Sequence, residues 1–145
     1  MKVCFLSMSS YPILVEKDFG FAGGAEVQLV SLAGELIFHG YDVSFVTFDY
    51  GQEYVSNVKN IEVVKTYNYE RAWETNFPTK FVYIMKALGK TNADIYVCSA
   101  DSHGILPFFC PLKKGKFICR IPSDKVVLGE ADRPFTRLVE FLDIK

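Results

Sequence analysis

The sequence predicts an α/β fold with a doubly wound, mostly parallel sheet. Three observations support this prediction. Short apolar segments alternate along the chain with segments of helical periodicity. The strand-like segments are rich in Val, Ile and Phe with little polar alternation, which is typical of strands buried on both faces of a sheet. The chain has 145 residues, half of them hydrophobic, so we expect one domain with helices on both faces of the sheet.

The first half of the chain contains one predicted helix and three predicted strands. The strands are expected at Lys2–Met8, Asp42–Phe48 and Ile61–Lys65. A long loop from Ser9 to Gly24 separates the first strand from the helix at Ala25–Phe38. Apolar residues recur on one face of this helix, namely Leu29, Val30, Ala33, Leu36 and Ile37. His39-Gly40 then ends the helix.

The second half continues the alternation. Strands are predicted at Asp94–Ser99 and Lys116–Ile121. Helices are predicted at Phe77–Leu88, at His103–Leu112, where two prolines interrupt it, and at Asp132–Ile144. The first of these helices has an apolar face that consists of Phe81, Ile84, Met85 and Leu88. We expect the five strands in the order 3-2-1-4-5, as in doubly wound sheets.

The cysteines predict the redox state of the protein. Cys4, Cys98, Cys110 and Cys119 lie far apart in apolar segments, and no Cys-x-x-Cys pair or histidine ligand spacing occurs. This pattern favours reduced thiols in a cytoplasmic protein, without a disulfide framework or a metal site. Cys4, Cys98 and Cys119 are expected to lie in three adjacent buried strands.

The charge of the chain bears on its partners. The net charge is −1, which argues against a nucleic-acid partner. No apolar run approaches the roughly 20 residues of a membrane span, and the first residues do not form a signal-peptide pattern. Lys113, Lys114 and Lys116 form a small basic cluster. A solvated surface is the favoured interpretation of this cluster, and a peripheral contact with membrane headgroups is the alternative.

The most specific local signal is Gly23-Gly24-Ala25-Glu26, at the junction of the long loop and the first helix. Two adjacent glycines expose backbone N–H groups with no side chain in the way. The helix N-terminus adds the positive end of its dipole. The motif therefore predicts a site for a phosphate or another anion, with a plain glycine-rich helix start as the alternative.

This motif and its surroundings resemble a known family. Met1–Phe48 is similar to the opening of GT-B glycosyltransferases of the large retaining family 4, in which a strand, a long loop, Gly-Gly-Ala-Glu and an amphipathic helix begin the N-terminal domain. The resemblance is also clear across Ala93–Lys125. There, Phe117–Asp124 matches the Phe-Ile-x-Arg-Ile-Ala-Ser-Asp strand of a subset of the family, with Pro122 in place of Ala.

The resemblance implies a Rossmann-like, acceptor-side domain over residues 1–145, with the C-terminal nucleotide-sugar domain absent from this chain. It implies transfer of a sugar from a nucleotide-sugar donor to a sugar or lipid-linked acceptor, with no metal or other cofactor. It also implies that this chain is inactive without the C-terminal domain of the full-length enzyme.

The resemblance also implies site residues on the loops that follow the strands. Gly23 and Gly24 would approach the donor diphosphate, and a side chain at Gly24 would obstruct that approach and disturb the loop conformation. The candidates on the acceptor side are Ser9, Ser10, His103, Arg120, Ser123 and Asp124. Loop solvation, helix capping or an Arg120–Asp124 ion pair are structural alternatives for these residues. Many relatives have a histidine at about Pro122, and its absence leaves the catalytic residues unassigned.

The alternative class is a non-catalytic Rossmann or flavodoxin-like domain that binds a nucleotide or regulates a partner. A receiver domain needs an acidic pair after the first strand, where this chain has Ser9 and Ser10. A dinucleotide oxidoreductase is disfavoured too. Asp49 lies about 25 residues after Gly24, but the Gly-x-Gly-x-x-Gly pattern that should follow the first strand is missing.

Overall fold

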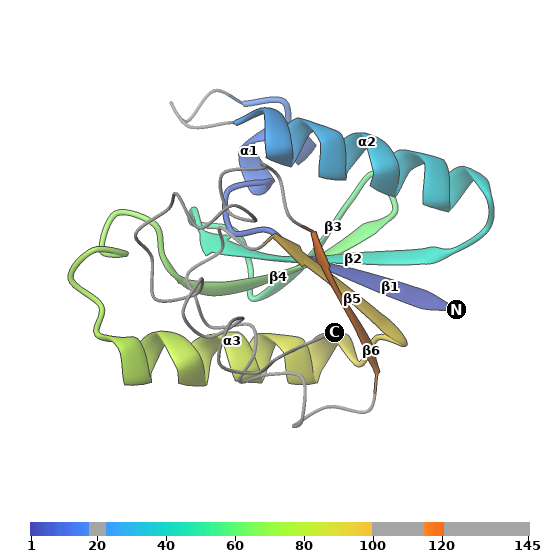
Figure 1. Cartoon of the computed structure of the whole chain (residues 1–145). Helices are drawn as coiled ribbons and strands as arrows, with labels where there is room; N and C mark the ends of the chain where they lie inside the picture. Colours follow the sequence, from blue (N-terminus) through green and yellow to red (C-terminus); the bar gives the residue numbers. More distant parts are fainter. Residues whose placement is uncertain (18–22, 100–114, 121–145) are drawn as a thin grey trace, which may run out of the picture.

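The computed structural model describes residues 1–17, 23–99 and 115–120. The helices predicted at His103–Leu112 and Asp132–Ile144 lie outside these residues, as does Cys110. The described residues form a mixed sheet with helices on both faces (Figure 1). This arrangement confirms the predicted fold class.

The sheet has six strands in the order β3-β4-β2-β1-β5-β6. The strands are β1 (Lys2–Leu6), β2 (Asp42–Asp49), β3 (Val55–Val58), β4 (Ile61–Asn68), β5 (Ile95–Ser99) and β6 (Lys116–Arg120). All neighbours pair in parallel except β3 and β4, which are antiparallel. The five predicted strands therefore lie in the predicted order 3-2-1-4-5, and β3 adds an edge strand that the sequence did not predict. A tight turn at Lys59 and Asn60, both with positive φ, connects β3 to β4.

The helices cover both faces of the sheet. α1 (Tyr11–Leu14) and α2 (Gly24–Phe38) lie on one face, and α3 (Phe77–Thr91) lies on the other (Figure 1). Leu29 and Ala33 of α2 pack in one core cluster with Phe5 and Phe45 of the sheet. On the opposite face, α3 packs against β-strand residues with its predicted apolar side, comprising Phe81, Ile84, Met85 and Leu88. The helical periodicity in the sequence therefore identified both buried faces.

The boundaries of α3 follow from its capping residues. The Asn76 side chain accepts a hydrogen bond from the Thr79 backbone N–H at 3.1 Å, which satisfies one of the unpaired donors of the first turn. Asn92 ends the helix in the left-handed conformation, with φ 45°. The helix therefore extends to Thr91, beyond the predicted end at Leu88.

The loop expected between Ser9 and Gly24 contains the short helix α1, so the loop prediction was wrong at Tyr11–Leu14. Pro12 stands in the first turn, where its missing N–H has no cost, and Pro12 and Leu14 are buried. Burial of Leu14 in the same core cluster as Leu29 stabilises a helix that would be too short to form alone.

The cysteine prediction was correct at two positions and wrong at the third. Cys4, Cys98 and Cys119 are reduced and lie on the adjacent strands β1, β5 and β6. Cys4 and Cys98 are buried, as expected, but Cys119 is exposed. It lies on β6, at the edge of the described sheet, where the strand has one neighbour instead of two.

Burial of Cys4 predicts a loss of stability at alkaline pH. Burial raises the pKa of its thiol from 9.0 to about 11. Between these values the unfolded chain binds fewer protons than the folded chain, so the free energy of unfolding should fall as the pH rises. This contribution is fully present below pH 9 and amounts to about 2–3 kcal/mol when lost. Urea titrations across this range should show a shallower fall for Cys4→Ala. Cys119→Ala is the control and should retain the full fall. Equal slopes for wild type and Cys4→Ala would contradict the assignment.

None of the helices among the described residues has the length and apolar character needed to cross a bilayer.

Candidate functional site

Three loops meet beyond the C-terminal ends of β1, β2 and β4, which is where ligands bind in open α/β sheets. Helices α2 and α3 both begin at this end of the sheet (Figure 1). The turn after β1 is held on β2, because the Ser7 N–H donates to the Val46 carbonyl at 3.1 Å. Phe48 in turn donates its N–H to the Met8 carbonyl at 2.9 Å. This edge of the sheet is therefore a rigid base for side chains that extend beyond it.

Three tyrosines from the three loops form a stack at this edge. Tyr11 follows β1, Tyr50 follows β2 and Tyr69 follows β4. The Tyr11 and Tyr50 rings stack at 5.8 Å between centroids, and the Tyr50 and Tyr69 rings stack at 4.9 Å. Offset aromatic pairs at these distances stabilise their loops relative to one another. The stack connects the loops after β1, β2 and β4 in one unit.

The Glu26 carboxylate at the start of α2 lies close enough to Tyr50 of this stack to affect its pKa. Burial raises the pKa of Tyr50 to about 12, and the nearby Tyr69 and Glu26 also raise it, while a hydrogen bond with Ser9 opposes them. Glu26 lies in the first turn of α2. The glycine motif, Ser9 and the tyrosine stack therefore belong to one region of the surface.

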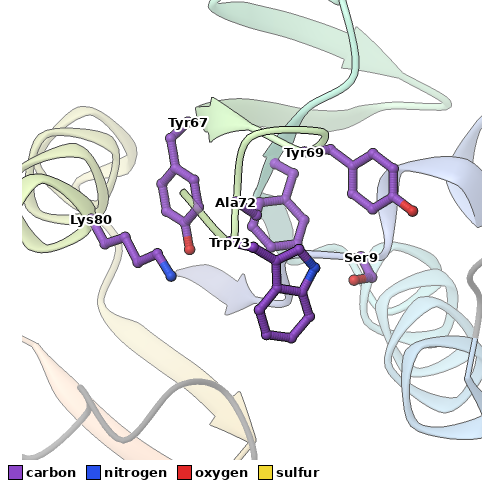
Figure 2. A pocket seen from close by; sticks show the side chains of 7 residues that line it. Ser9, Tyr67, Tyr69, Ala72, Trp73 and Lys80 are labelled. Carbon is purple, nitrogen blue, oxygen red and sulfur yellow. The ribbon is translucent and has the colours of Figure 1, made fainter. Parts of the chain in front are cut away.

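A cavity of about 250 Å³ opens beside the stack (Figure 2). Most of its lining is aromatic or apolar, and the lining residues are Ser9, Phe48, Tyr67, Tyr69, Ala72, Trp73 and Lys80. This volume lies just below the range of about 300–1,000 Å³ that small-molecule sites occupy. It suits one compact unit, such as a single sugar ring, better than an extended chain.

Two polar groups reach the cavity from opposite elements. Tyr67 comes from the end of β4 and Lys80 from the first turns of α3, and the Lys80 Nζ lies 5.9 Å from the centroid of the Tyr67 ring. Figure 2 shows the phenol oxygen and the ammonium group directed to the same part of the cavity. The Tyr67 hydroxyl is buried and has no hydrogen-bond partner among the described residues.

Trp73 stands at the cavity on a well-defined turn. The Arg71 N–H donates to Asn68 Oδ1 at 3.2 Å, and the Thr75 hydroxyl donates to the Arg71 carbonyl at 2.8 Å. The indole of Trp73 is nevertheless 95% exposed. A large aromatic ring is usually buried because it removes much apolar area from water. Trp73 is therefore a large aromatic side chain held at the cavity rim and open to solvent.

The glycine motif forms an open helix start. Gly23 is the N-cap residue of α2 in extended conformation, and as a glycine it makes no side-chain capping hydrogen bond. Gly24 is exposed, and no atom of the described residues lies within 4 Å of the position that a Cβ would occupy. The loop conformation therefore does not require glycine at position 24, which corrects that part of the sequence prediction. At Gly23 an added Cβ would lie 2.6 Å from Glu26 Oε2, the end of a flexible side chain.

The other predicted site residues have different positions. Ser9 lines the cavity, whereas Ser10 is fully buried and its hydroxyl lies 2.6 Å from that of Ser7. Ser10 therefore has a structural partner and is not exposed to the cavity. Arg120 is the last residue of β6, paired in register with Ser99. His103, Ser123 and Asp124 lie outside the described residues, as do Lys113 and Lys114.

The aromatic residues of the cavity and Lys80 were not predicted from the sequence. The signal was present in the run Tyr67-Asn68-Tyr69-Glu70-Arg71-Ala72-Trp73, where three aromatic residues cluster in a polar segment. The predicted strand ended at Lys65, whereas β4 continues to Asn68. That difference placed Tyr67 in a loop instead of at the sheet edge.

A second cavity of about 460 Å³ lies on the other side of Tyr67 and is more polar. Asp49, Lys65 and Lys86 in its lining already have partners in the structure. Lys65 lies 3.0 Å from Asp49, and Lys86 lies over the Tyr54 ring at 5.5 Å from its centroid. Asp49 also accepts a hydrogen bond from the Gly51 N–H at 2.8 Å. These contacts give Asp49 a role in the turn after β2.

In the ranges 1–17, 23–99 and 115–120, no group of three or more His, Cys, Asp or Glu side chains is placed to hold a metal ion.

Comparison with known proteins supports the fold. No protein-family model and no curated protein matches this sequence. Among solved structures, sucrose-phosphate synthase from Thermosynechococcus elongatus aligns with a TM-score of 0.62 and 16% identity, over 92% of this chain. The chain spans 36% of the length of that protein. At this identity the likeness establishes a shared α/β fold.

Proposed function

We propose that this chain is the N-terminal, acceptor-side domain of a retaining glycosyltransferase that uses a nucleotide-sugar donor. The observation that carries the proposal is the open Gly23-Gly24 helix start at the same end of the sheet as the aromatic cavity. The structural likeness to a sucrose-phosphate synthase and the Gly-Gly-Ala-Glu resemblance support it. No specific observation favours a regulatory nucleotide-binding domain.

In this proposal the two features have separate roles. The donor diphosphate lies at the N-terminus of α2, where the helix dipole and backbone N–H groups favour an anion. The acceptor occupies the cavity, which holds it by aromatic contacts and orients the hydroxyl that attacks. Stabilisation of the negative charge that develops on the leaving diphosphate is the main electrostatic contribution expected at such a site.

The proposed reaction needs further binding contacts with the donor. A helix N-terminus on an exposed surface contributes only about 0.3–1 kcal/mol to anion binding, which gives no useful affinity by itself. We therefore propose that a C-terminal domain, beyond residue 145, supplies most of the contacts with the nucleotide sugar. We also propose that the enzyme is cytoplasmic. Arg120, Ser123, Asp124 and His103 remain proposed acceptor-side residues.

This division of labour gives a direct activity test. The 145-residue chain should transfer no sugar from a panel of radiolabelled nucleotide sugars, whereas a longer protein that includes the proposed C-terminal domain should do so. Melting temperature measured with nucleotide sugars, NAD and FMN separates the alternative classes, because only a bound ligand stabilises the folded state. Sugar transfer by residues 1–145 alone would refute the two-domain proposal. Stabilisation of the longer protein by FMN or NAD, and not by a nucleotide sugar, would refute the glycosyltransferase proposal.

A further inference from the structure

We infer that the aromatic cavity of Ser9, Tyr67, Tyr69, Trp73 and Lys80 binds an anionic sugar unit, a hexose that carries a carboxylate or a phosphate group. The identification of this sugar as the acceptor rests on the proposed function. The binding of the sugar to this cavity does not depend on it.

The aromatic walls favour a sugar ring. Figure 2 shows Tyr67, Tyr69 and Trp73 around the cavity. The apolar C–H face of a hexose can pack on an aromatic ring, while its hydroxyl groups remain in contact with water at the rim. Most of the cavity surface is aromatic or apolar and only a few polar groups converge on it, which is the usual composition of a small-molecule site.

The polar groups favour an anion on that sugar. Lys80 forms no salt bridge with a carboxylate within the described part of the chain, where the ion pairs involve Lys2, Lys59 and Lys65. An ammonium group has three N–H donors and no acceptor. Its charge near an apolar wall is therefore available to an incoming carboxylate or phosphate, with which it forms the stronger, charge-assisted type of hydrogen bond.

Tyr67 supplies a second donor. Its side chain is 4% exposed, and its hydroxyl has no hydrogen-bond partner in residues 1–17, 23–99 and 115–120. A buried polar group without a partner is unfavourable, and native proteins rarely retain one. Burial also raises the pKa of Tyr67 to about 12, so the hydroxyl keeps its proton at neutral pH and can donate it.

The donor bias distinguishes an anionic sugar from a neutral one. Each sugar hydroxyl group has one O–H to donate, and carboxylate and amide oxygens are the side-chain groups suited to accept it. Among the described residues that line this cavity there is no carboxylate or amide side chain, whereas Lys80 and Tyr67 both donate. Carboxylate and phosphate oxygens only accept, and they match this pair of donors.

The chain contains an intrinsic reporter for this site. Trp73 is the only tryptophan in the sequence, and it lines the cavity. Titration of the 145-residue protein with glucuronate or glucose 6-phosphate should shift and saturate its fluorescence. Neutral glucose should bind at least about tenfold more weakly, which corresponds to loss of one charge-assisted contact. Inorganic phosphate and uridine are the control ligands. Both should leave the Trp73 emission unchanged at concentrations at which the anionic sugars saturate the site.

Matched variants test the two donors. Lys80→Met should weaken glucuronate and glucose 6-phosphate binding by about tenfold or more, whereas Lys86→Met on the same helix should not. Tyr67→Phe removes only the buried hydroxyl and should weaken binding by several-fold, on the order of one hydrogen bond, without lowering the melting temperature. Tyr83→Phe, at a half-exposed neighbour of the Tyr67 ring, is its control.

The outcomes separate this inference from the proposed function. The inference would be overturned by equal affinity for glucose and the anionic sugars, or by a stronger fluorescence response to uridine. It would also be overturned by a response to inorganic phosphate alone, or by no saturable change in fluorescence. So would unchanged binding in Lys80→Met together with Tyr67→Phe. If the anionic sugars bind but the longer protein transfers no sugar, the inference stands and the proposed function fails. If the longer protein transfers sugar only to neutral acceptors, the function stands and the identification of the anionic sugar as the acceptor fails.

Discussion

Replacement of Phe45 by alanine should lower the free energy of unfolding by about 3–5 kcal/mol, the usual cost of removing a buried phenyl ring. Phe45 is completely buried in β2, between β1 and β4. Its ring stacks on Phe5 at 5.0 Å between centroids. A single domain has a total stability of roughly 5–15 kcal/mol, so this one change should remove a large share of it.

Urea denaturation followed by circular dichroism measures this effect. Phe38→Ala is the matched control, because Phe38 is 84% exposed at the end of α2. Its removal should change the free energy of unfolding by no more than about 0.5 kcal/mol. Similar losses for the two variants would show that Phe45 is not in the folding core.

The sheet and its two covering helices could be predicted because their signals are long and periodic. β1 and β2 are rich in apolar residues and almost continuously buried, and α2 and α3 carry an apolar residue at each turn that faces the sheet. β3 could not be predicted in the same way. It has four residues, of which only Val55 and Val58 are apolar, and its stability comes from antiparallel pairing with β4.

The candidate site was predictable only in part, for a similar reason. The glycine motif is contiguous in sequence, so its position at a helix start could be inferred directly. The cavity instead combines Ser9 after β1, Phe48 at the end of β2, Tyr67 at the end of β4 and Lys80 in α3. Such a site depends on strand register and on the point at which each strand ends. Element boundaries are the least reliable part of a sequence-based prediction.

The structure also changes the physical argument about Gly24. Within the described part of the chain, a Cβ at this position meets nothing within 4 Å. Gly24 is also the first residue of α2, where it needs no left-handed conformation. Glycine at a position that tolerates a side chain costs stability, because it adds entropy to the unfolded chain. Gly24→Ala should therefore stabilise the fold by about 0.4–1 kcal/mol. A requirement for glycine must then come from a ligand.

The expected result for Gly24→Val follows from this geometry. In the longer enzyme that we propose, turnover should fall at least about tenfold, which is a loss of about 1.4 kcal/mol of transition-state stabilisation, while the melting temperature stays the same or rises. The valine side chain would occupy the open space at the helix start, where the donor diphosphate must approach the backbone N–H groups.

Gly34→Val is the matched control for this experiment. Gly34 lies in the same helix, is exposed and has no atom of the described residues within 4 Å of its Cβ position, but it lies about three turns from the N-terminus. Its substitution should leave turnover unchanged. Steady-state rates and thermal melts of both variants separate a ligand effect from a folding effect. If Gly24→Val retains full turnover, or loses activity only in step with its melting temperature, then the glycine motif is an ordinary helix start and the diphosphate binds elsewhere.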